Sequence, residues 1–567
     1  MPAYEPPVAE FLAILREVLA AEAEGLDLPT LEAVLEEGGR FATRVLAPLN
    51  ASGDAEGCRI EQGAVRTPAG FPEAYRQFVA AGWPALSQPE RWGGQAMPRL
   101  AQLALDEMIA ATNFSFGLFP GLTRGAAEAI ARHAAPALQD AYLPKLVSGA
   151  WAGAMALTEA QAGTDLGLLT TRAVPRPDGS LAVTGSKIFI TAGDHDLAEN
   201  IIHLVLARLP DAPPGVRGIS LVLVPKFLPD AQGRPGQRNA MAAGALERKM
   251  GIHASPTCVM HYDGATGWLV GAPHRGLAAM FTMMNAERLF VGIQGLGIAE
   301  AAGQAAADYA RNRRQGRAPG QAEGAAQPIL AHPDVRRMLL TIRGFTTAGR
   351  ALALWLALQL DRAEAGDAEA DGLVALLTPV VKAAFTDLGF EATVLGQQVL
   401  GGHGYVRDNG LEQMVRDARI AQIYEGTNGV QAMDLATRKL AAEGGALPHR
   451  FFALVRASLA QGAGEPALAE ALDRLEAATR QLQRDGAGAA EAGAAAAEYL
   501  RLFALVALGW MWLRLRQAAA ASDRPQHRRW REGAGFFFAR ILPQSAALAA
   551  AIAAGPATLM AAEEALF

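Results

Sequence analysis

The sequence predicts a mainly α-helical α+β protein made of four consecutive parts. Hydrophobic residues make up 51% and charged residues 19% of the 567 residues, a composition that can bury more than one core and is not typical of disorder. The hydrophobic period changes from helical to β-rich and back along the chain, and the later helical stretches contain few helix breakers. These observations favour helical domains on either side of a small β domain.

The first two parts differ in their hydrophobic pattern. Residues 1–153 carry helical spacing and alanine-rich faces punctuated by Gly and Pro, which predicts an N-terminal helical domain. Residues 154–273 contain short β-rich runs, "LAVTGSKIFIT", "NIIHLVLAR", "GISLVLVP" and "TCVMHYDG", separated by Pro, Gly and Asp. We therefore predict a middle β domain inserted between helical ones.

Helical spacing returns in the last two parts. Residues 274–440 hold long amphipathic patterns typical of antiparallel helices packed as a bundle, and residues 441–567 predict an additional helical domain. Its most apolar run, "LFALVALGWMWL", lies between Arg501 and Arg514 and is shorter than the roughly 18 residues of a spanning helix. We expect a buried helix there and no transmembrane segment.

Charge and cysteine usage exclude several functional classes. A formal net charge of −6 argues against a nucleic-acid binder. The two cysteines, Cys58 and Cys258, form no disulfide or metal spacing, and the acidic N-terminus is no signal peptide, so we predict a cytoplasmic protein. No zinc spacing, P-loop or G-x-S-x-G motif is present, so no metal is expected. The glycines of "GIQGLG" (292–297) have the wrong spacing for a dinucleotide fingerprint and predict close helix packing.

Three segments form a candidate site. "ALTEAQAGTDLG" (156–167) is a small-residue loop whose amides and hydroxyls can approach a flat ligand. "GSKIFIT" (185–191) places Phe189 and Thr191 at alternate strand positions on one face, which also fits plain core alternation. "QIYEGTNGV" (422–430) sets Glu425 in a Gly-rich turn ahead of a helix, and such a carboxylate is either a solvated surface group or a site residue.

The order of these segments, together with "MNAERLF", "YARNRRQGR" and "QVLGGHGYVRDNGLEQMVRDARIAQIYEGTNGVQ", resembles the acyl-CoA dehydrogenase family over roughly residues 80–440. The resemblance implies an N-terminal helical domain, a middle β-barrel-like domain and a C-terminal four-helix bundle. The residues from about 450 on, and "KMGIHASPTCVMHYDGATGWLVG" (249–271), resemble a bacterial subgroup with an extra C-terminal domain that includes 3-methylmercaptopropionyl-CoA dehydrogenase-like proteins.

The resemblance assigns a chemistry to Glu425. In the family the glutamate of "IYEGT" removes the α-proton of an acyl-CoA thioester while the β-hydrogen passes as hydride to flavin N5 of FAD, giving a trans-2-enoyl-CoA. Burial beside an acyl chain and a flavin would raise the pKa of the carboxylate towards the working pH, as a base requires. The backbone N–H of Glu425 and a flavin ribityl hydroxyl would bind the thioester oxygen.

The resemblance also assigns the family's cofactor and substrate contacts to the matching positions of this sequence. The resemblance assigns FAD binding to a flavin-facing loop and strand, to an arginine and a "QxxGG" segment that meet the FAD of a neighbouring subunit, and to the start of the last helix. These residues are Leu157, Thr158, Gly163, Thr164, Phe189, Thr191, Arg313, Gln398, Gly401, Gly402, Thr427 and Asn428. The residues assigned to acyl-CoA binding are Thr164, Asn285, Arg288, Tyr424 and Gly426.

The resemblance also implies partners. Electrons would pass to electron-transferring flavoprotein, and a homodimer or homotetramer would share each FAD site between subunits. "RRQGR" (313–317) and "TNGV" (427–430) depart from the family pattern without touching Glu425, and His403 is interpreted as structural. Two alternatives stay open, an acyl-CoA oxidase and a catalytically silent acyl-CoA-binding scaffold. Acyl chain length or thioether preference, the electron acceptor, dimer versus tetramer and the role of the residues after about 441 are not predicted.

Overall fold

The computed structural model describes residues 4–321, 323–462, 464–484, 486 and 488–566. The chain forms two compact units, each made of segments that are distant in the sequence. We call the first the helical unit (Met1–Gly39, Pro98–Ala111 and Val291–Phe567) and the second the sheet unit (Arg40–Met97 and Thr112–Phe290). Each unit is described by itself.

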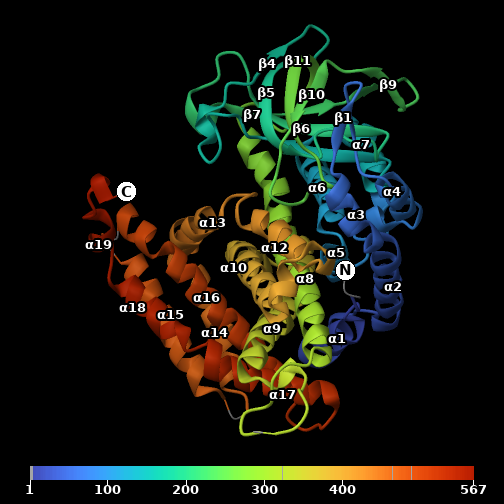
Figure 1. The fold of residues 1–567 in the computed structure, drawn as a ribbon. Helices are drawn as coiled ribbons and strands as arrows, with labels where there is room; N and C mark the ends of the chain where they lie inside the picture. The colour runs from blue at the N-terminus through green and yellow to red at the C-terminus, as the bar shows by residue number, and fades with distance from the viewer. Residues whose placement is uncertain (1–3, 322, 463, 485, 487, 567) are drawn as a thin grey trace. The chain divides into compact units, whose positions relative to one another are not determined.

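A seven-stranded sheet forms the core of the sheet unit (Figure 1). Strand order is β10-β11-β5-β4-β6-β3, and β7 pairs with both β11 and β6, so five of the strands close a ring. The sheet is therefore barrel-like, as predicted. The strands are β3 (Trp151–Ala156), β4 (Arg172–Pro175), β5 (Leu181–Thr191), β6 (Asn200–Arg208), β7 (Ile219–Pro225), β10 (Met241–Leu246) and β11 (Thr257–Val270).

Two kinds of strand pattern build this sheet. Strand β6 is buried on both faces and is apolar from Ile201 to Ala207 except at His203, whereas β5 alternates between buried and more exposed positions over its first residues. Helix α6 (Phe114–His133) begins at Asn113, whose side chain accepts from the Phe116 amide, and packs on β3. Gly153 of β3 permits this close approach, because a Cβ there would lie 2.5 Å from the Cβ of Ala126.

The remaining elements of the sheet unit are short. They are π-helix η3 (Ala42–Leu46), helices α3 (Pro48–Glu56), α4 (Phe71–Ala80) and α7 (Pro136–Val147), the hairpins β1 (Arg59–Glu61) with β2 (Ala64–Arg66) and β8 (Phe227–Pro229) with β9 (Pro235–Arg238), and the 3₁₀ turns η4 (Trp83–Ala85), η5 (Glu90–Trp92), η6 (Leu166–Leu168) and η7 (Gly215–Gly218).

Long helices form the centre of the helical unit. Helix α8 (Gly276–Asn312) enters this unit at Val291 and packs through Gly292 and Gly295 on α10 (Ala368–Leu400), which also packs on α9 (Pro333–Glu364). A Cβ on Gly295 would lie 2.4 Å from the Phe385 carbonyl oxygen, so the predicted close helix packing of residues 292–297 is confirmed. Shorter elements follow, namely η8 (Ile329–Ala331), α11 (Gly402–Tyr405), η9 (Arg407–Asn409), α12 (Leu411–Arg419), η10 (Ile420–Gln422), α13 (Asn428–Asp434), η11 (Leu435–Lys439) and η12 (Ala442–Gly445).

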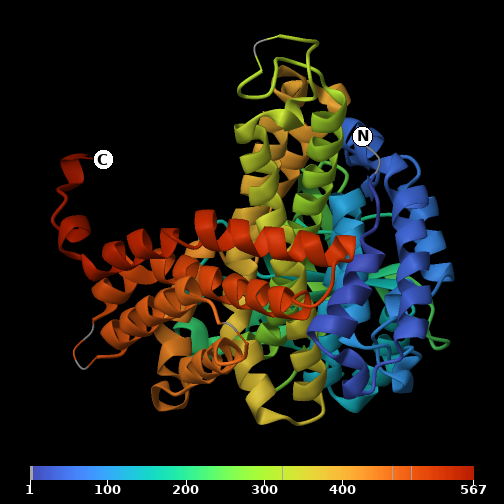
Figure 2. The same cartoon turned by 90° about the horizontal axis from the view of Figure 1, so that it is seen from below.

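The C-terminal segment adds further helices to the helical unit. Helix α16 (Ala489–Ala518) contacts α9, α10, α13 and most of the other late helices, from α14 to α18, and the orange and red ribbons of Figure 2 run alongside one another. The predicted buried helix at "LFALVALGWMWL" is confirmed as part of α16, where Trp512 donates to the Gly344 carbonyl at 2.8 Å. The other late helices are α14 (Leu447–Leu459), α15 (Pro466–Gln483), α17 (Pro525–Phe536), η13 (Phe537–Ile541), α18 (Gln544–Ala553), α19 (Ala557–Met560) and η14 (Glu564–Leu566).

A buried ionic cluster fixes the N-terminal helix to the helical unit. Arg350 of α9 is fully buried and pairs with Glu10 of α1 (Val8–Ala13), Glu107 of α5 (Arg99–Thr112) and Glu300 of α8. Burial raises the pKa of Glu107 to about 7, against the lowering effect of the Arg350 charge. The other N-terminal elements are η1 (Ile14–Val18), η2 (Ala21–Glu24) and α2 (Leu28–Phe41).

The expectation of no transmembrane segment rested on the shortness of one apolar run, and helix length and composition do not support that reason. Among the described residues, three helical segments are long and apolar enough to cross a membrane by these two criteria, Ala368–Leu400, Ala489–Ala518 and Pro525–Ala553. Their most apolar windows are buried within the structure to 72%, 67% and 33% respectively. The expectation judged the run at 502–513 alone, whereas α16 continues over 30 residues.

Candidate active site

The predicted site residues fall into two groups, one in each unit. The sheet unit holds Leu157, Thr158, Gly163, Thr164, Phe189, Thr191, Asn285 and Arg288. The helical unit holds Arg313, Gln398, Gly401, Gly402, Tyr424, Glu425, Gly426, Thr427 and Asn428.

Backbone and side-chain bonds bring the loop after β3, which is predicted to face the flavin, beside the end of strand β5. The Ile188 amide donates to the Thr158 carbonyl at 2.9 Å, and the Lys187 Nζ donates to the Leu157 carbonyl at 2.9 Å. Leu157 and Thr158 directly follow β3, so the loop and Phe189 lie together.

Phe189 is in a conformation that a core strand residue does not adopt. Its φ is 60°, and its side chain is 59% exposed. The register of β5 against β11 shifts between Cys258 and Met260, so β5 has an extra residue between Lys187 and Ile190. Phe189 and Thr191 are both more exposed than Ile190, as the predicted alternation requires. A bulge that turns a strained, exposed aromatic ring outward indicates a functional position.

A buried ion pair between Lys187 and Glu159 lies next to this bulge. Lys187 is fully buried and its Nζ lies 2.9 Å from Glu159 Oε1, while Glu159 also accepts from the amides and hydroxyls of Thr170 and Thr171. Burial raises the pKa of Glu159, but the Lys187 charge and the Thr171 bonds outweigh it, so the net pKa lies far below its usual range. Burial lowers the pKa of Lys187 to about 8, against the opposing effect of Glu159.

The rest of the sheet-unit group is more open. Gly163 and Thr164 are exposed, and a Cβ on Gly163 would meet no atom within 4 Å. Thr191 is half-buried and precedes Ala192, a second left-handed residue with a φ of 52°. Arg288 is 6% exposed and donates to Asn285 Oδ1 at 3.1 Å, so both side chains lie together on α8.

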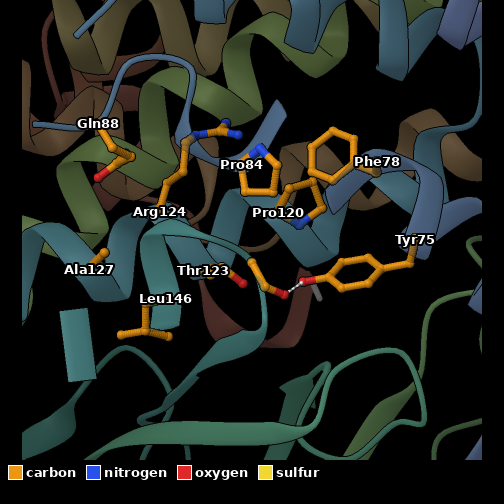
Figure 3. Close-up of a pocket in the computed structure, with 10 residues that line it drawn as sticks. Tyr75, Phe78, Pro84, Gln88, Pro120, Thr123, Arg124, Ala127 and Leu146 are labelled. Atoms are coloured by element: carbon orange, nitrogen blue, oxygen red, sulfur yellow. Dashed lines mark hydrogen bonds between the residues drawn. The ribbon is translucent and has the colours of Figure 1, made fainter. Parts of the chain in front are cut away.

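The sheet unit also contains a small pocket that is separate from these residues (Figure 3). Its empty volume is about 280 Å³, including space open to solvent, and it is lined by residues such as Tyr75, Phe78 and Arg124. The Tyr75 hydroxyl donates to the Gly149 carbonyl at 3.0 Å across it. None of the predicted site residues lines it.

Glu425 has the same kind of strained backbone as Phe189. Its φ is 56°, followed by 82° at Gly426, so two successive residues are left-handed. The Glu425 Oε2 atom is shielded from solvent, although the residue as a whole is half-buried. The hydroxyl of Tyr424 donates to Gln294 Oε1 on α8, so this side chain is anchored within the unit. A non-glycine residue held in this region indicates a conformation imposed by the surrounding structure.

Helix α10 supplies the bonds that hold this turn. Lys382, which is fully buried, donates from Nζ to the Gly426 carbonyl and to Asn428 Oδ1, each at 2.8 Å. Asp387 Oδ1 accepts from Asn428 Nδ2 at 2.7 Å and from Gln422 Nε2 at 2.6 Å.

At the start of α13, the side chains of both residues predicted to bind the cofactor form hydrogen bonds within the protein. Thr427 is the N-cap, and its hydroxyl accepts from the Val430 amide at 3.2 Å. The Asn428 side chain faces α10, where it bonds Lys382, Thr386 and Asp387. Any contact of Asn428 with a cofactor therefore falls to its backbone, whereas the exposed Thr427 hydroxyl, which accepts from Val430, can still donate.

The remaining helical-unit residues are exposed. Arg313 follows α8, and within the described residues its guanidinium makes no hydrogen bond or ion pair. Gln398, Gly401 and Gly402 are exposed at the end of α10, and Gly401 has a φ of 60°. His403 lies beside them, and its Nδ1 atom shares a hydrogen bond of 2.6 Å with the Tyr309 hydroxyl. This contact fits the structural role predicted for His403.

The sequence-based prediction missed the buried side chains that support both groups. Lys187, Lys382 and Gln431 bond backbone carbonyls next to Phe189 or Glu425, and Asp387 bonds the side chains of Gln422 and Asn428. None of the four was assigned a role. A signal was present, because Lys187 stands at a core position of an alternating strand and Lys382 stands inside the apolar run "PVVKAAF".

These residues fit a flavin. An exposed, outward-turned aromatic ring beside an open glycine loop offers a stacking surface and close backbone approach to a flat ring system. The exposed glycines after Gln398 and the exposed Arg313 offer amides and a permanent positive charge to phosphate oxygens.

Comparisons with known proteins agree with this fit. Residues 29–150 match the acyl-CoA dehydrogenase N-terminal domain, 154–265 the middle domain, 274–440 the C-terminal domain, and 451–563 the acetyl-CoA dehydrogenase C-terminal-like domain. The 3-methylmercaptopropionyl-CoA dehydrogenase of Ruegeria pomeroyi is 43% identical over 528 residues, covering 89% of this chain and 90% of that protein. The chain belongs to the acyl-CoA dehydrogenase family, in the subgroup with an extra C-terminal domain.

Two solved structures are similar in fold. Caenorhabditis elegans ACDH-11 in complex with C11-CoA has a TM-score of 0.79 and 20% identity, and the match covers 94% of this chain and 91% of that one. A chain from work on the electron transferring flavoprotein of Acidaminococcus fermentans has a TM-score of 0.60 and 26% identity, over 73% of this chain and 98% of that one.

Family membership confirms the predicted class and cofactor. The protein is an FAD-dependent oxidoreductase, an acyl-CoA dehydrogenase that acts on an acyl-CoA. The predicted fold class is confirmed as well, with a helical N-terminal part, a middle sheet, a helical C-terminal part and extra C-terminal helices.

Proposed function

We propose that Glu425 is the base that removes the α-proton of the acyl-CoA thioester, giving a trans-2-enoyl-CoA. The observation that carries this proposal is the left-handed backbone of Glu425, with a φ of 56°. The turn around it is held by hydrogen bonds to Lys382, Asp387 and Gln294. A carboxylate with one oxygen shielded from solvent is a stronger base than a hydrated one. FAD, when bound, supplies the acceptor for the hydride that leaves the β-carbon.

The backbone of the same turn binds the thioester oxygen in this proposal. Negative charge develops on that oxygen as the proton leaves, and a fixed N–H, here that of Glu425, stabilises it without reorganisation. Gly426 has a φ of 82° and no side chain, so it allows the substrate to approach the backbone.

In the sheet unit, the flavin contacts are proposed for Leu157, Thr158, Gly163, Thr164, Phe189 and Thr191. Phe189 supplies the stacking surface, and Thr158 is fixed beside it by the Ile188 amide. Arg313, Gln398, Gly401 and Gly402 meet the FAD of a neighbouring subunit in a homodimer or homotetramer. Their exposure supports that assignment.

We take 3-methylmercaptopropionyl-CoA as the first substrate to test and electron-transferring flavoprotein as the acceptor. The 43% identity to the Ruegeria enzyme supports the substrate, and the likeness to the Acidaminococcus chain supports the acceptor. In CoA binding, Asn285 and Arg288 hold the nucleotide part and Thr164 faces it, while Tyr424 and Gly426 line the acyl group.

An anaerobic titration tests this function. The purified holoenzyme is mixed with 3-methylmercaptopropionyl-CoA and with straight-chain acyl-CoAs of graded length, and the loss of flavin absorbance is followed. We expect full bleaching by one or more thioesters, with the lowest half-saturating concentration for the thioether substrate. Bleaching only by straight-chain thioesters would reject the substrate assignment, and no bleaching by any thioester would reject the function. Fast reoxidation by oxygen in place of electron-transferring flavoprotein would identify an oxidase.

A further inference from the structure

Three side chains of helix α10 contact the residues on both sides of Glu425. Lys382 and Thr386 are one turn apart on the face that meets the start of α13, and Asp387 follows them. All three lie within the helical unit together with Glu425. From this arrangement we propose that Lys382 is the positioning residue of the catalytic turn, acting with Thr386 and Asp387 as a buried clamp.

The clamp holds the turn on its C-terminal side. The Lys382 ammonium lies 2.8 Å from the Gly426 carbonyl oxygen and 2.8 Å from Asn428 Oδ1. Lys382 is 0% exposed, so its long side chain is immobilised and its bonds do not compete with water. Charge-assisted bonds of this kind are roughly twice as strong as neutral ones. The carbonyl one residue after Glu425 is thereby fixed in orientation.

The clamp also reaches the N-terminal side of the turn. Asp387 Oδ1 accepts from Gln422 Nε2, three residues before Glu425, and from Asn428 Nδ2, three residues after it. Gln431 Nε2 adds bonds to the Glu425 and Gly426 carbonyls at 3.3 and 3.4 Å. Bonds at both ends prevent the left-handed pair from relaxing into an ordinary turn.

This arrangement bears on proton removal. A non-glycine residue in the left-handed region, here Glu425, costs about 1–3 kcal/mol and persists only where surrounding contacts over-determine it. If those contacts weaken, the turn relaxes and the Glu425 carboxylate moves away from the α-carbon. A displacement of about 1 Å lowers rates about 100-fold. The clamp therefore acts on the proton-transfer step.

Two threonines of α10 provide a matched pair of variants. Thr386 and Thr393 are both buried and both donate to a carbonyl of their own helix, at 2.9 Å to Lys382 and 2.7 Å to Phe390. Of the two, Thr386 also accepts from Asn428 Nδ2, at 3.0 Å. Replacement of either by Val removes one hydroxyl at constant shape, so the two variants differ in their contact with the clamp.

The test uses anaerobic stopped-flow reduction of the FAD-loaded full chain by a thioester that bleaches the wild type. We expect Lys382→Met to lower the limiting reduction rate by about 10- to 100-fold and Thr386→Val by about 3-fold. The dissociation constant of the thioester and the flavin content should stay within about 2-fold. The α-deuterium isotope effect should rise because proton removal becomes more rate-limiting. Thr393→Val should match the wild type.

The inference rests on the proposed role of Glu425, and the test separates the two. It is overturned if Thr386→Val keeps the wild-type rate and isotope effect, or if the loss in either variant merely follows lost flavin or weaker thioester binding. Should Lys382→Met fail to fold, Thr386→Val against Thr393→Val decides alone. A Glu425→Gln protein that is reduced normally would instead reject the proposed function.

Discussion

Two buried lysines, one in each unit, hold strained backbone in different ways. Lys187 binds the carbonyl of Leu157 and a carboxylate, Glu159, next to the left-handed Phe189. Lys382 binds the carbonyl of Gly426 and the side-chain amide oxygen of Asn428, next to the left-handed Glu425. In both places a fully buried ammonium fixes a carbonyl beside a residue with positive φ.

The difference between the two lies in their partners and in what they support. The Lys187 pair is an internal salt bridge under an exposed ring, so its loss should cost stability and its strength should depend on protonation of Glu159. The Lys382 bonds act on a turn that carries the proposed base, so their loss should cost rate. A buried cation can therefore stabilise the proposed cofactor surface in one unit and orient the proposed base in the other.

The largest expected effect on stability is in the sheet unit. Lys187→Met leaves Glu159 buried without its cation, and breaking one side of a buried pair costs about 3–5 kcal/mol. The free energy of unfolding, measured from urea denaturation, should fall by that amount. Lys145→Met, at a partly exposed position, should change it by less than about 0.5 kcal/mol. A loss below about 1 kcal/mol for Lys187→Met would show that the pair does not support the unit.

Phe189 should matter for the cofactor more than for stability. Phe189→Ala removes a ring that is 59% exposed, so the unfolding midpoint should barely move. Loss of aromatic stacking, worth about 0.5–1.5 kcal/mol, should weaken FAD binding about 2- to 12-fold, measured by fluorescence titration of the apoprotein. Phe189→Trp, which keeps a stacking surface, should retain FAD. Unchanged FAD affinity in Phe189→Ala would remove the ring from the proposed contacts.

The salt bridge also predicts a pH dependence. Because the folded-state pKa of Glu159 lies below its usual value of 4.5, the unfolded chain binds more protons as the pH falls through that value. The stabilisation by this pair is thus complete above about pH 5 and is lost progressively below pH 4.5. Urea unfolding between pH 7 and pH 3.5 should show a shallower acid loss in Glu159→Gln/Lys187→Met than in the wild type. Equal slopes would contradict the assignment.

The smallest predicted effect is a gain in stability. Glu425→Gly should raise the free energy of unfolding by up to about 1 kcal/mol, because glycine adopts a positive φ without the steric cost paid by other residues. Glu425→Ala keeps a Cβ and should bring no such gain. Both variants should fail to reduce the flavin. If Glu425→Gly is not more stable than Glu425→Ala, the turn holds no strain.

Much of the fold was predictable because it depends on hydrophobic period. The change from helical to β-rich texture, the buried run in α16 and the close packing of glycines 292–297 are all consequences of side-chain pattern. The start of α13 at Asn428 followed from Gly, Thr and Asn in the preceding turn. The positions of the domain boundaries at about 153, 273 and 440 stay predictions.

The site was predictable in its motifs and not in its geometry. The bulge that turns Phe189 outward depends on the register of β11, about 70 residues later in the sequence, so alternation within β5 could not reveal it. The contacts of Lys382 with Gly426 and Asn428 span 44 and 46 residues and depend on how α10 meets α13. Local patterns report which residues are unusual, whereas their partners are determined by tertiary packing.

The central claim is that Glu425, held in a left-handed turn, removes the α-proton. The most direct measurement is a single anaerobic turnover of Glu425→Gln beside the wild type, with thioester binding and flavin absorbance recorded together. We predict that the variant keeps its FAD and binds the thioester within about 3-fold of the wild type, and that its flavin reduction slows at least 1,000-fold, since a missing general base costs about 10²–10⁴-fold. Reduction of the variant at the wild-type rate would contradict the claim and place the base elsewhere.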